Sequence, residues 1–191
     1  MGQDEDPKVV TLQTTDPDYQ TVSKTFIASV QQPNATIIKI ERIQNKTLYQ
    51  QYVAKKKQIS KQSSQPAERK LWHGTSADAI VSLYTHGFNR SYCGKNATYY
   101  GDGVYFAVNA NYSAQNTYSR PDSQGHKYMY YASVLTGDFA RGQQGMRVPP
   151  VKSTNKSQLH DSVVNDVNSP QIFVIFNDTQ AYPDYLITFT L

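Results

Sequence analysis

The sequence predicts an α+β fold whose sheet is mainly antiparallel. Patterns typical of helices come early in the chain, and strand-like runs dominate after residue 100. The regular alternation of strand and helix that builds a parallel sheet is missing. The 191 residues show no internal repeat and are enough for one domain with a buried core. We therefore expect residues 1–15 to form a leader or linker and residues 16–191 to form a single domain.

The first expected elements are a short strand at residues 8–12, within the leader, and a helix that begins beside Asp16. Asp16 suits the N-cap position, and Pro17 suits the first turn. The apolar face of this helix recurs at helical spacing. It consists of Tyr19, Val22, Phe26 and Val30.

A strand and a second helix follow. Residues 36–43 alternate around Ile38 and Ile40, which predicts a half-buried strand. Asn45 can cap the next helix. The apolar face of that helix carries Leu48, Tyr52 and Ile59. Residues 61–68, rich in Gln and Ser and containing a proline, predict a mobile linker.

The middle of the chain alternates short strands with short helices. Residues 71–73 predict a strand, and the helix after it can end at Gly87, a residue suited to a C-cap. Residues 104–108 predict another strand, and residues 110–118 predict a short helix.

The last third is mostly strand and loop. Residues 128–135 are aromatic and β-branched, which predicts a core strand. Residues 141–161 contain several Gly and Pro and predict an irregular loop. Shorter strands are expected at 163–164, 172–176 and 186–189, with turns around residues 177–180 and Pro183.

Composition excludes several classes of protein. No apolar run approaches the roughly 20 residues that span a bilayer, and the acidic N-terminus does not resemble a signal peptide. The single Cys93 cannot form an internal disulfide or a thiol-based zinc site. We expect an intracellular protein, cytoplasmic or nuclear, without a membrane partner. The net charge of +4 includes Lys55, Lys56, Lys57 and Lys61, for which a solvated helix face is favoured over a nucleic-acid patch.

Two apolar, strand-like pieces each end beside glycines and one polar ring. His73 precedes Gly74, and Tyr105 follows the run Gly101-Asp102-Gly103. Strand ends are where side chains can converge on a ligand. For a lone His73, a structural histidine hydrogen-bonded to backbone would be the favoured interpretation, but Gly74 favours a functional one because it lets the backbone approach a ligand closely. Neither a Rossmann glycine motif nor a Walker motif is present.

These residues resemble the catalytic core of the poly(ADP-ribose) polymerase (PARP) family. The resemblance runs from about Ile37 to the C-terminus. Its core motifs are Leu71-Trp72-His73-Gly74, Tyr100 to Ala107, Ser113 and Tyr118. A wider set resembles the macrodomain-bearing mono-ADP-ribosyltransferases of that family: His86 to Arg90, Gly94-Lys95-Asn96-Ala97 and Gln180 to Pro183.

The resemblance implies an ADP-ribosyltransferase fold, with split, mainly antiparallel sheets, flanking helices and no helical regulatory domain. It implies NAD as co-substrate, bound without a metal. His73 would donate a hydrogen bond to a ribose hydroxyl, and the backbone of Gly74 would clasp the nicotinamide carboxamide. Ser113 would bind the carboxamide oxygen. Tyr105 and Tyr118 would surround the nicotinamide ring, since aromatic faces attract a pyridinium.

The sequence departs from the polymerases at the third catalytic position. Those enzymes carry Glu at the start of the late strand, where Ile172 stands here. The alternative to an Ile at the third catalytic position is a carboxylate displaced along the sequence, Asp178 or Asp184. The expected function is transfer of one ADP-ribose to acceptor proteins, including this chain itself, with inhibition by nicotinamide mimics. A catalytically weak or inactive module that binds NAD or ADP-ribose is the competing interpretation, and action on nucleic acid is a third without support from a motif.

The remaining reactive side chains suggest no further site. His86, His126 and His160 lack the spacing of metal ligands. Cys93 has no activating partner in the sequence, so a nucleophilic role is not expected.

Overall fold

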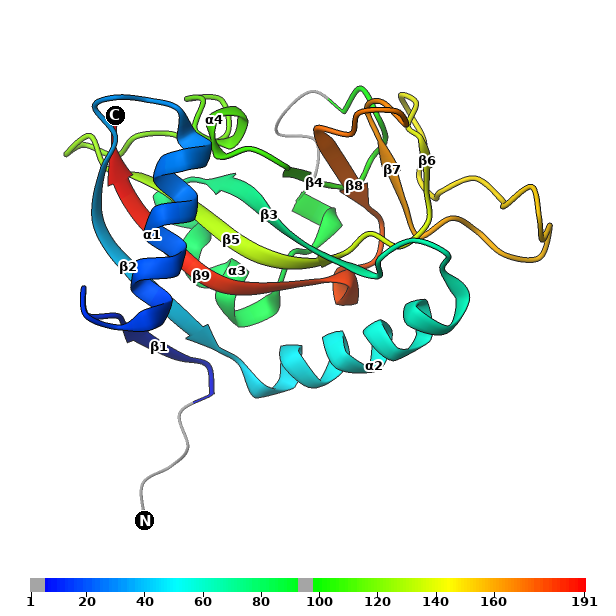
Figure 1. The fold of residues 1–191 in the computed structure, drawn as a ribbon, viewed down its shortest axis with the longest axis horizontal. Coiled ribbons are helices and arrows are strands. Elements are labelled where there is room, and N and C mark those ends of the chain that lie inside the picture. The colour runs from blue at the N-terminus through cyan, green and yellow to red at the C-terminus, as the bar shows by residue number, and fades with distance from the viewer. Residues whose placement is uncertain (1–5, 93–97) are drawn as a thin grey trace, which may run out of the picture.

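The computed structural model describes residues 6–92 and 98–191 and confirms an α+β fold (Figure 1). Its helices are α1 (Pro17–Val30), α2 (Lys46–Gln62), α3 (Ile80–His86) and α4 (Ala110–Ser113), with 3₁₀ turns η1 (Ala77–Ala79), η2 (Arg90–Tyr92) and η3 (Asp178–Gln180). Its strands are β1 (Lys8–Thr11), β2 (Thr36–Gln44), β3 (Glu68–Thr75), β4 (Val104–Ala107), β5 (Lys127–Leu135), β6 (Phe139–Arg141), β7 (Ser162–Val164), β8 (Ile172–Ile175) and β9 (Ala181–Thr190).

Within the described residues, these strands form one sheet in the order β1-β2-β9-β5-β3-β4-β8-β7-β6. Neighbouring strands are antiparallel except for β6 and β7. β3 pairs with β5 along its whole length but with β4 only at Trp72 and Ala107. The sheet is therefore continuous but nearly divided between β3 and β4, which is how the expected split appears in this chain.

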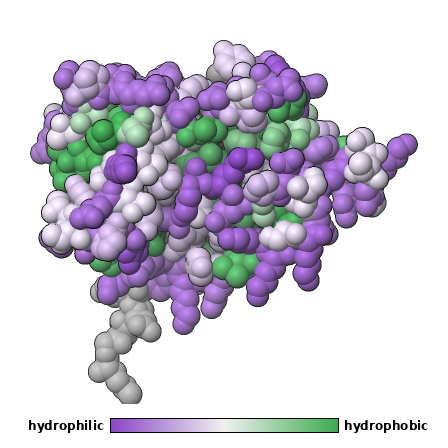
Figure 2. Space-filling model, viewed as in Figure 1, coloured by the Kyte–Doolittle hydropathy of each residue, from purple (hydrophilic) through white to green (hydrophobic). Residues whose placement is uncertain are grey.

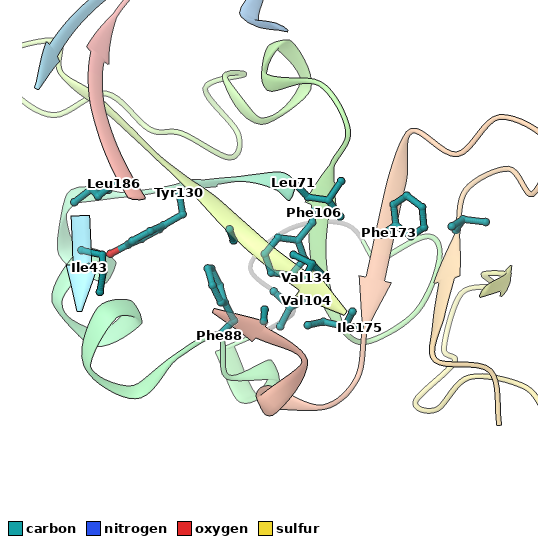
Figure 3. Packing of buried hydrophobic residues seen from close by; sticks show 13 residues of the cluster. Ile43, Leu71, Phe88, Val104, Phe106, Tyr130, Val134, Phe173, Ile175 and Leu186 are labelled. Atoms are coloured by element: carbon teal, nitrogen blue, oxygen red, sulfur yellow. The ribbon is translucent and has the colours of Figure 1, made fainter. Parts of the chain in front are cut away.

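Each face of the sheet has its own apolar core. Leu71 and Trp72 follow each other in β3 and so point to opposite faces. Trp72 packs under α1, with its ring 5.8 Å from that of Phe26. Leu71 belongs to the cluster under α3, together with Phe88 and Tyr130 (Figure 3). Figure 1 shows α1 in front of the sheet and α3 behind it.

The expected starts of α1 and α2 are confirmed, although the Asp16 side chain accepts a hydrogen bond from the Gln13 amide and makes no capping hydrogen bond to α1. α1 begins at Pro17 after the N-cap Asp16, and Val22, Phe26 and Val30 are buried along it. At α2 the Asn45 side chain accepts a hydrogen bond from the Leu48 amide. Caps of this kind are local contacts, which is why the sequence could place them. Figure 2 shows hydrophilic residues along the side of the molecule where α2 lies.

Two expectations about strands were wrong, and a register shift accompanies each of them. Ile38 is 48 % exposed whereas Ile40 is fully buried, since the pairing of β2 with β9 shifts register between Ile37 and Lys39. β9 runs far beyond the expected residues 186–189 and includes Pro183. A register shift against β5 occurs beside that proline, where a missing amide hydrogen is tolerated.

Two further boundaries also differ from the expectation. The helix expected at residues 110–118 ends at Ser113, because the polar residues that follow form turns. The expected linker shrinks to residues 63–67 and is tied down, since Ser64 and Gln65 donate backbone hydrogen bonds to the Asp138 carboxylate.

The N-terminal segment contributes to the sheet. β1 lies at one edge and pairs with β2. The domain boundary at residue 16 stays a prediction. Among the described helices, none combines the length and apolar character that a bilayer crossing requires.

Candidate active site

A cleft of about 750 Å³ lies where β3 and β4 part. Strand ends, α3, α4 and the turn after α4 supply its walls. All six residues that the sequence placed at the site line it: His73, Gly74, Tyr105, Ser113, Tyr118 and Ile172. Residues more than 90 positions apart thus meet at one cleft.

Gly74 is required by the packing of the chain itself. A Cβ atom at this position would lie 2.3 Å from the carbonyl oxygen of Ser113 and 3.0 Å from Cβ of Tyr118. A distance of 2.3 Å does not occur between such non-bonded atoms, so any side chain would push the turn after α4 away from β3. The glycine that was expected to admit a ligand also admits the segment that carries Ser113 and Tyr118.

The same strand presents backbone groups to the cleft. Ser113 is buried, and its hydroxyl donates to the carbonyl of Trp72 over 3.1 Å. Peptide groups two residues apart in an extended strand point the same way, so those of Gly74 face the same side. In the described residues β4 pairs with β3 no further than Trp72. The amide and carbonyl of Gly74 therefore lie where β4 no longer covers β3.

His73 is held as a neutral acceptor. Its Nδ1 lies 2.8 Å from the carbonyl oxygen of Tyr105, and a carbonyl has only lone pairs, so Nδ1 must carry the hydrogen. Burial lowers the pKa of His73 below its ordinary value, although the bond to Tyr105 opposes the shift. The neutral ring then has an unprotonated Nε2. With this tautomer Nε2 can accept a hydrogen bond but cannot donate one, whereas the expected ribose contact had His73 as the donor; the contact itself stays a prediction.

Tyr105 uses its hydroxyl to hold the chain before β4. The hydroxyl donates to the Gly101 carbonyl over 2.9 Å and accepts from the Tyr100 amide over 3.0 Å. Its ring lines the cleft and packs against the cluster that contains Ile172. Tyr105 therefore links the wall of the cleft to the preceding loop.

Tyr118 is paired with Tyr112, a cleft residue that the sequence did not indicate. The two rings are stacked with centroids 5.0 Å apart and planes inclined by 24°, and their hydroxyls are 2.7 Å apart. Tyr112 precedes Ser113 on α4, which ends there, and residues six positions apart do not share a face of a helix. Only the turn between them brings the rings together, so no periodic pattern could have shown this pair.

The two carboxylates considered as substitutes for the missing Glu, Asp178 and Asp184, lie outside the cleft that Ile172 lines. Ile172 is 3 % exposed and pairs with Ala107 across β4 and β8. Asp184 lies on β9, where Lys70 approaches it to 2.8 Å, and Asp178 accepts a hydrogen bond from the Arg90 amide. Neither aspartate lines the cleft. Among the described residues the lining carboxylate is Asp78, which is exposed on η1.

The other candidate residues lie elsewhere. His160 binds the Pro150 carbonyl, and His126 lies 3.8 Å from Asp122. Over residues 6–92 and 98–191, no group of three His, Cys, Asp or Glu side chains could hold a metal ion. Cys93 and the motif residues 94–97 lie outside the described residues.

Comparison with known proteins agrees with this geometry. The family model described as the poly(ADP-ribose) polymerase catalytic domain matches residues 16–144. The chain is 50 % identical over 183 residues to human protein mono-ADP-ribosyltransferase PARP14, covering 95 % of the chain and 10 % of that protein. It is 40 % identical over 174 residues to mouse protein mono-ADP-ribosyltransferase PARP10, covering 90 % and 18 %.

A third relative is mouse protein mono-ADP-ribosyltransferase PARP12, 40 % identical over 185 residues, which cover 96 % of the chain and 25 % of that protein. The chain thus spans a quarter or less of the length of these three relatives. The family model stops before β8, so Ile172 lies outside the matched residues. The matched region includes all the other residues that line the cleft, which lie between His73 and Arg120. The chain therefore belongs to the poly(ADP-ribose) polymerase catalytic domain family.

Proposed function

We propose that the chain transfers one ADP-ribose from NAD to side chains of acceptor proteins, including its own, and releases nicotinamide. The observation that carries this proposal is the cleft itself. It brings together an acceptor imidazole, an uncovered backbone pair at Gly74, a buried hydroxyl and aromatic rings. The names of the relatives, all protein mono-ADP-ribosyltransferases, support the same reaction.

The nicotinamide end of NAD fits the part of the cleft beside β3. A carboxamide offers one carbonyl and one amide group, and the uncovered peptide groups of Gly74 offer the matching donor and acceptor. The Ser113 hydroxyl can rotate its hydrogen from the Trp72 carbonyl to the carboxamide oxygen. Tyr118 and Tyr105 then supply ring faces for the pyridinium, whose positive charge is attracted by aromatic π-systems.

The chemistry needs little beyond positioning. The bond between the ribose anomeric carbon and the pyridinium nitrogen breaks, and its electron pair neutralises the ring. Nicotinamide leaves uncharged and needs no acid. An acceptor oxygen, such as an ionised carboxylate of the target protein, forms the new bond to the anomeric carbon. The transition state resembles an oxocarbenium ion. Nε2 of His73 would accept a hydrogen bond from a ribose hydroxyl and fix the sugar for attack.

Ile172 limits the reaction to one transfer. Adding a second ADP-ribose requires a ribose hydroxyl as nucleophile, and this weak nucleophile benefits from a carboxylate that orients and deprotonates it. Ile172 can do neither, and Asp178 and Asp184 lie outside the cleft. An acceptor carboxylate arrives already ionised, so the first transfer does not need that help.

Incubation with labelled NAD, followed by mass spectrometry of modified sites, tests the proposal. We expect covalent label on the chain in discrete gel bands that a poly(ADP-ribose)-degrading hydrolase does not shorten. His73→Ala should abolish labelling, whereas His160→Ala, which loses only a contact to the Pro150 carbonyl, should not. A hydrolase-sensitive smear would refute single transfer. Binding of NAD without any label would support the inactive module instead.

A further inference from the structure

Tyr112 is a cleft-lining residue to which the proposed reaction gives no role. Its ring stacks on that of Tyr118 with an inclination of 24°, and its hydroxyl meets the Tyr118 hydroxyl at 2.7 Å. Stacking covers one face of the Tyr118 ring, so a nicotinamide ring would have to use the opposite face. Tyr112 thus covers the face of the Tyr118 ring opposite to the one that the nicotinamide would contact.

The backbone of Tyr118 is fixed by contacts of its own, separate from those of its ring. α4 has ended at Ser113, and Tyr118 lies in a turn in which its amide donates to the Gln115 carbonyl over 2.9 Å. That bond orients the backbone but leaves the side-chain torsions free. Without a neighbour, the half-exposed ring could take several rotamers, and ligand binding would have to select one of them at an entropic cost.

Tyr112 is itself well anchored. It lies on α4 one residue before Ser113, whose hydroxyl is fixed to β3. Its ring also packs against the buried cluster that includes Ala107, Val174 and Ile172. Burial, followed by the hydrogen bond with Tyr118, raises the pKa of Tyr112 above its ordinary value, so the phenol stays neutral and the contact between the hydroxyls persists at physiological pH.

We propose that Tyr112 is a positioning residue that holds the ring of Tyr118 in the orientation required for nicotinamide binding, without touching the ligand. The proposal rests on the proposed function, because it assumes that Tyr118 is the stacking platform. In this arrangement the ring of Tyr118 contacts the ligand, and the ring of Tyr112, packed against the buried cluster that contains Ile172, supports it. The chain then binds nicotinamide tightly only when both rings are present.

A double-mutant cycle with benzamide as the probe tests this role, because interaction between neighbours appears as non-additivity. Tyr112→Leu should weaken benzamide binding by roughly three- to tenfold, the range that the loss of an aromatic pair gives. Tyr112→Phe keeps the stacked ring and should recover much of that loss. In the Tyr118→Leu background, Tyr112→Leu should cause no further loss, because the ring that it supports is gone.

Isothermal titration calorimetry gives the affinities, and thermal unfolding shows whether each variant folds. Tyr49→Leu removes a tyrosine that is 53 % exposed on α2, away from the cleft, and should leave benzamide affinity unchanged. Equal losses from Tyr112→Leu in both backgrounds would overturn the positioning role alone. Tighter binding by Tyr112→Leu would also overturn it, because the ring would then compete with the ligand. A wild-type chain that binds no benzamide would refute the nicotinamide site itself, and this role with it.

Discussion

The two parts of the sheet that meet at the cleft are held together in different ways. On the side of β3, strands pair over long stretches: β3 with β5 from Glu68 to Thr75, and β5 with β9 from Lys127 to Val134. On the side of β4, the strands β4, β8, β7 and β6 have only three or four residues each. Short strands offer few ladder hydrogen bonds to fix their position.

Side-chain contacts compensate on the short-strand side. Lys152 is 8 % exposed in its side chain and lies 2.6 Å from Asp138 and 3.9 Å from Asp161. Burial alone would raise the pKa of Asp138, but hydrogen bonds from Lys152 and Ser64 hold it well below its usual range. We call Lys152, Asp138 and Asp161 the ionic cluster. It joins the turn after α2, the approach to β6 and the loop before β7.

The cleft takes residues from both sides, so its geometry depends on the short strands around β4 as much as on the long strands around β3. His73 and Gly74 come from the long strand β3, whereas Tyr105 and Ile172 come from β4 and β8. Within the described sheet, a single pair of residues, Trp72 on β3 and Ala107 on β4, joins the two sides. Changes that weaken the short-strand side should therefore affect both stability and ligand binding.

The largest effect is expected from Lys152→Met. It leaves two partly buried carboxylates without their nearly buried cation, a change that costs up to about 3–5 kcal/mol in the free energy of unfolding when the charges are fully buried. Urea denaturation measures the loss. Lys56→Met is the matched control, since Lys56 pairs with Glu68 while 43 % exposed and should cost about 1 kcal/mol or less. Similar losses for both lysines would contradict the special role of the ionic cluster.

The second-largest effect is expected from Gly74→Ala, because Gly74 lies where β3 and β4 part. The added Cβ would meet the Ser113 carbonyl at 2.3 Å, and overpacking of this kind costs about 1–3 kcal/mol. Benzamide affinity should fall by more than the loss of stability suggests, since Ser113 and Tyr118 would both move. Gly125→Ala meets no atom within 4 Å and should carry only the strain of a φ of 80°, about 1 kcal/mol, with unchanged affinity. If Gly74→Ala binds benzamide with the affinity of the wild type, the turn after α4 can shift without disturbing the cleft.

Acid should lower the free energy of unfolding through protonation of His73. The folded pKa of His73 is lowered by burial, so below its ordinary pKa of about 6.5 the unfolded chain takes up a proton that the folded chain resists. The free energy of unfolding should therefore decrease as the pH falls from 6.5 toward the folded pKa, by at most about 1.4 kcal/mol per pH unit. His73→Gln should lack this part of the pH dependence. Thermal unfolding of the wild type and of His73→Gln, compared over this pH range, isolates the contribution of His73, because the other histidines are unchanged. If stability depends on pH in the same way in both proteins, the pKa of His73 is not lowered by folding.

Tyr105→Phe should have the smallest effect and a local one. It removes the hydroxyl that binds Gly101 and Tyr100 but keeps the ring that lines the cleft. Benzamide affinity should change by less than about threefold, whereas amide exchange of Tyr100 should accelerate by about tenfold, as expected for the loss of one hydrogen bond. Unchanged exchange at Tyr100 would show that other contacts hold this segment.

Local patterns in the sequence determined the types of element, the starts of α1 and α2 and the site motifs. Caps and apolar periodicity act over a few residues, so Asp16 and Asn45 are readable without the fold. His73 and Tyr105 are equally readable because they lie in strand-like pieces near glycines. Ser113, Tyr118 and Ile172 were expected only from the resemblance to the family. All six site residues line one cleft in the structure.

Only the tertiary structure decided what depends on contacts between distant segments. The exposure of Ile38 follows from a bulge against β9, and the turn after α4 brings Tyr112 onto Tyr118. The hydrogen on Nδ1 of His73 follows from the carbonyl of Tyr105, which is 32 residues away in the chain. Hydrogen bonding and packing between such segments are set by the whole sheet, and no short stretch of sequence specifies them.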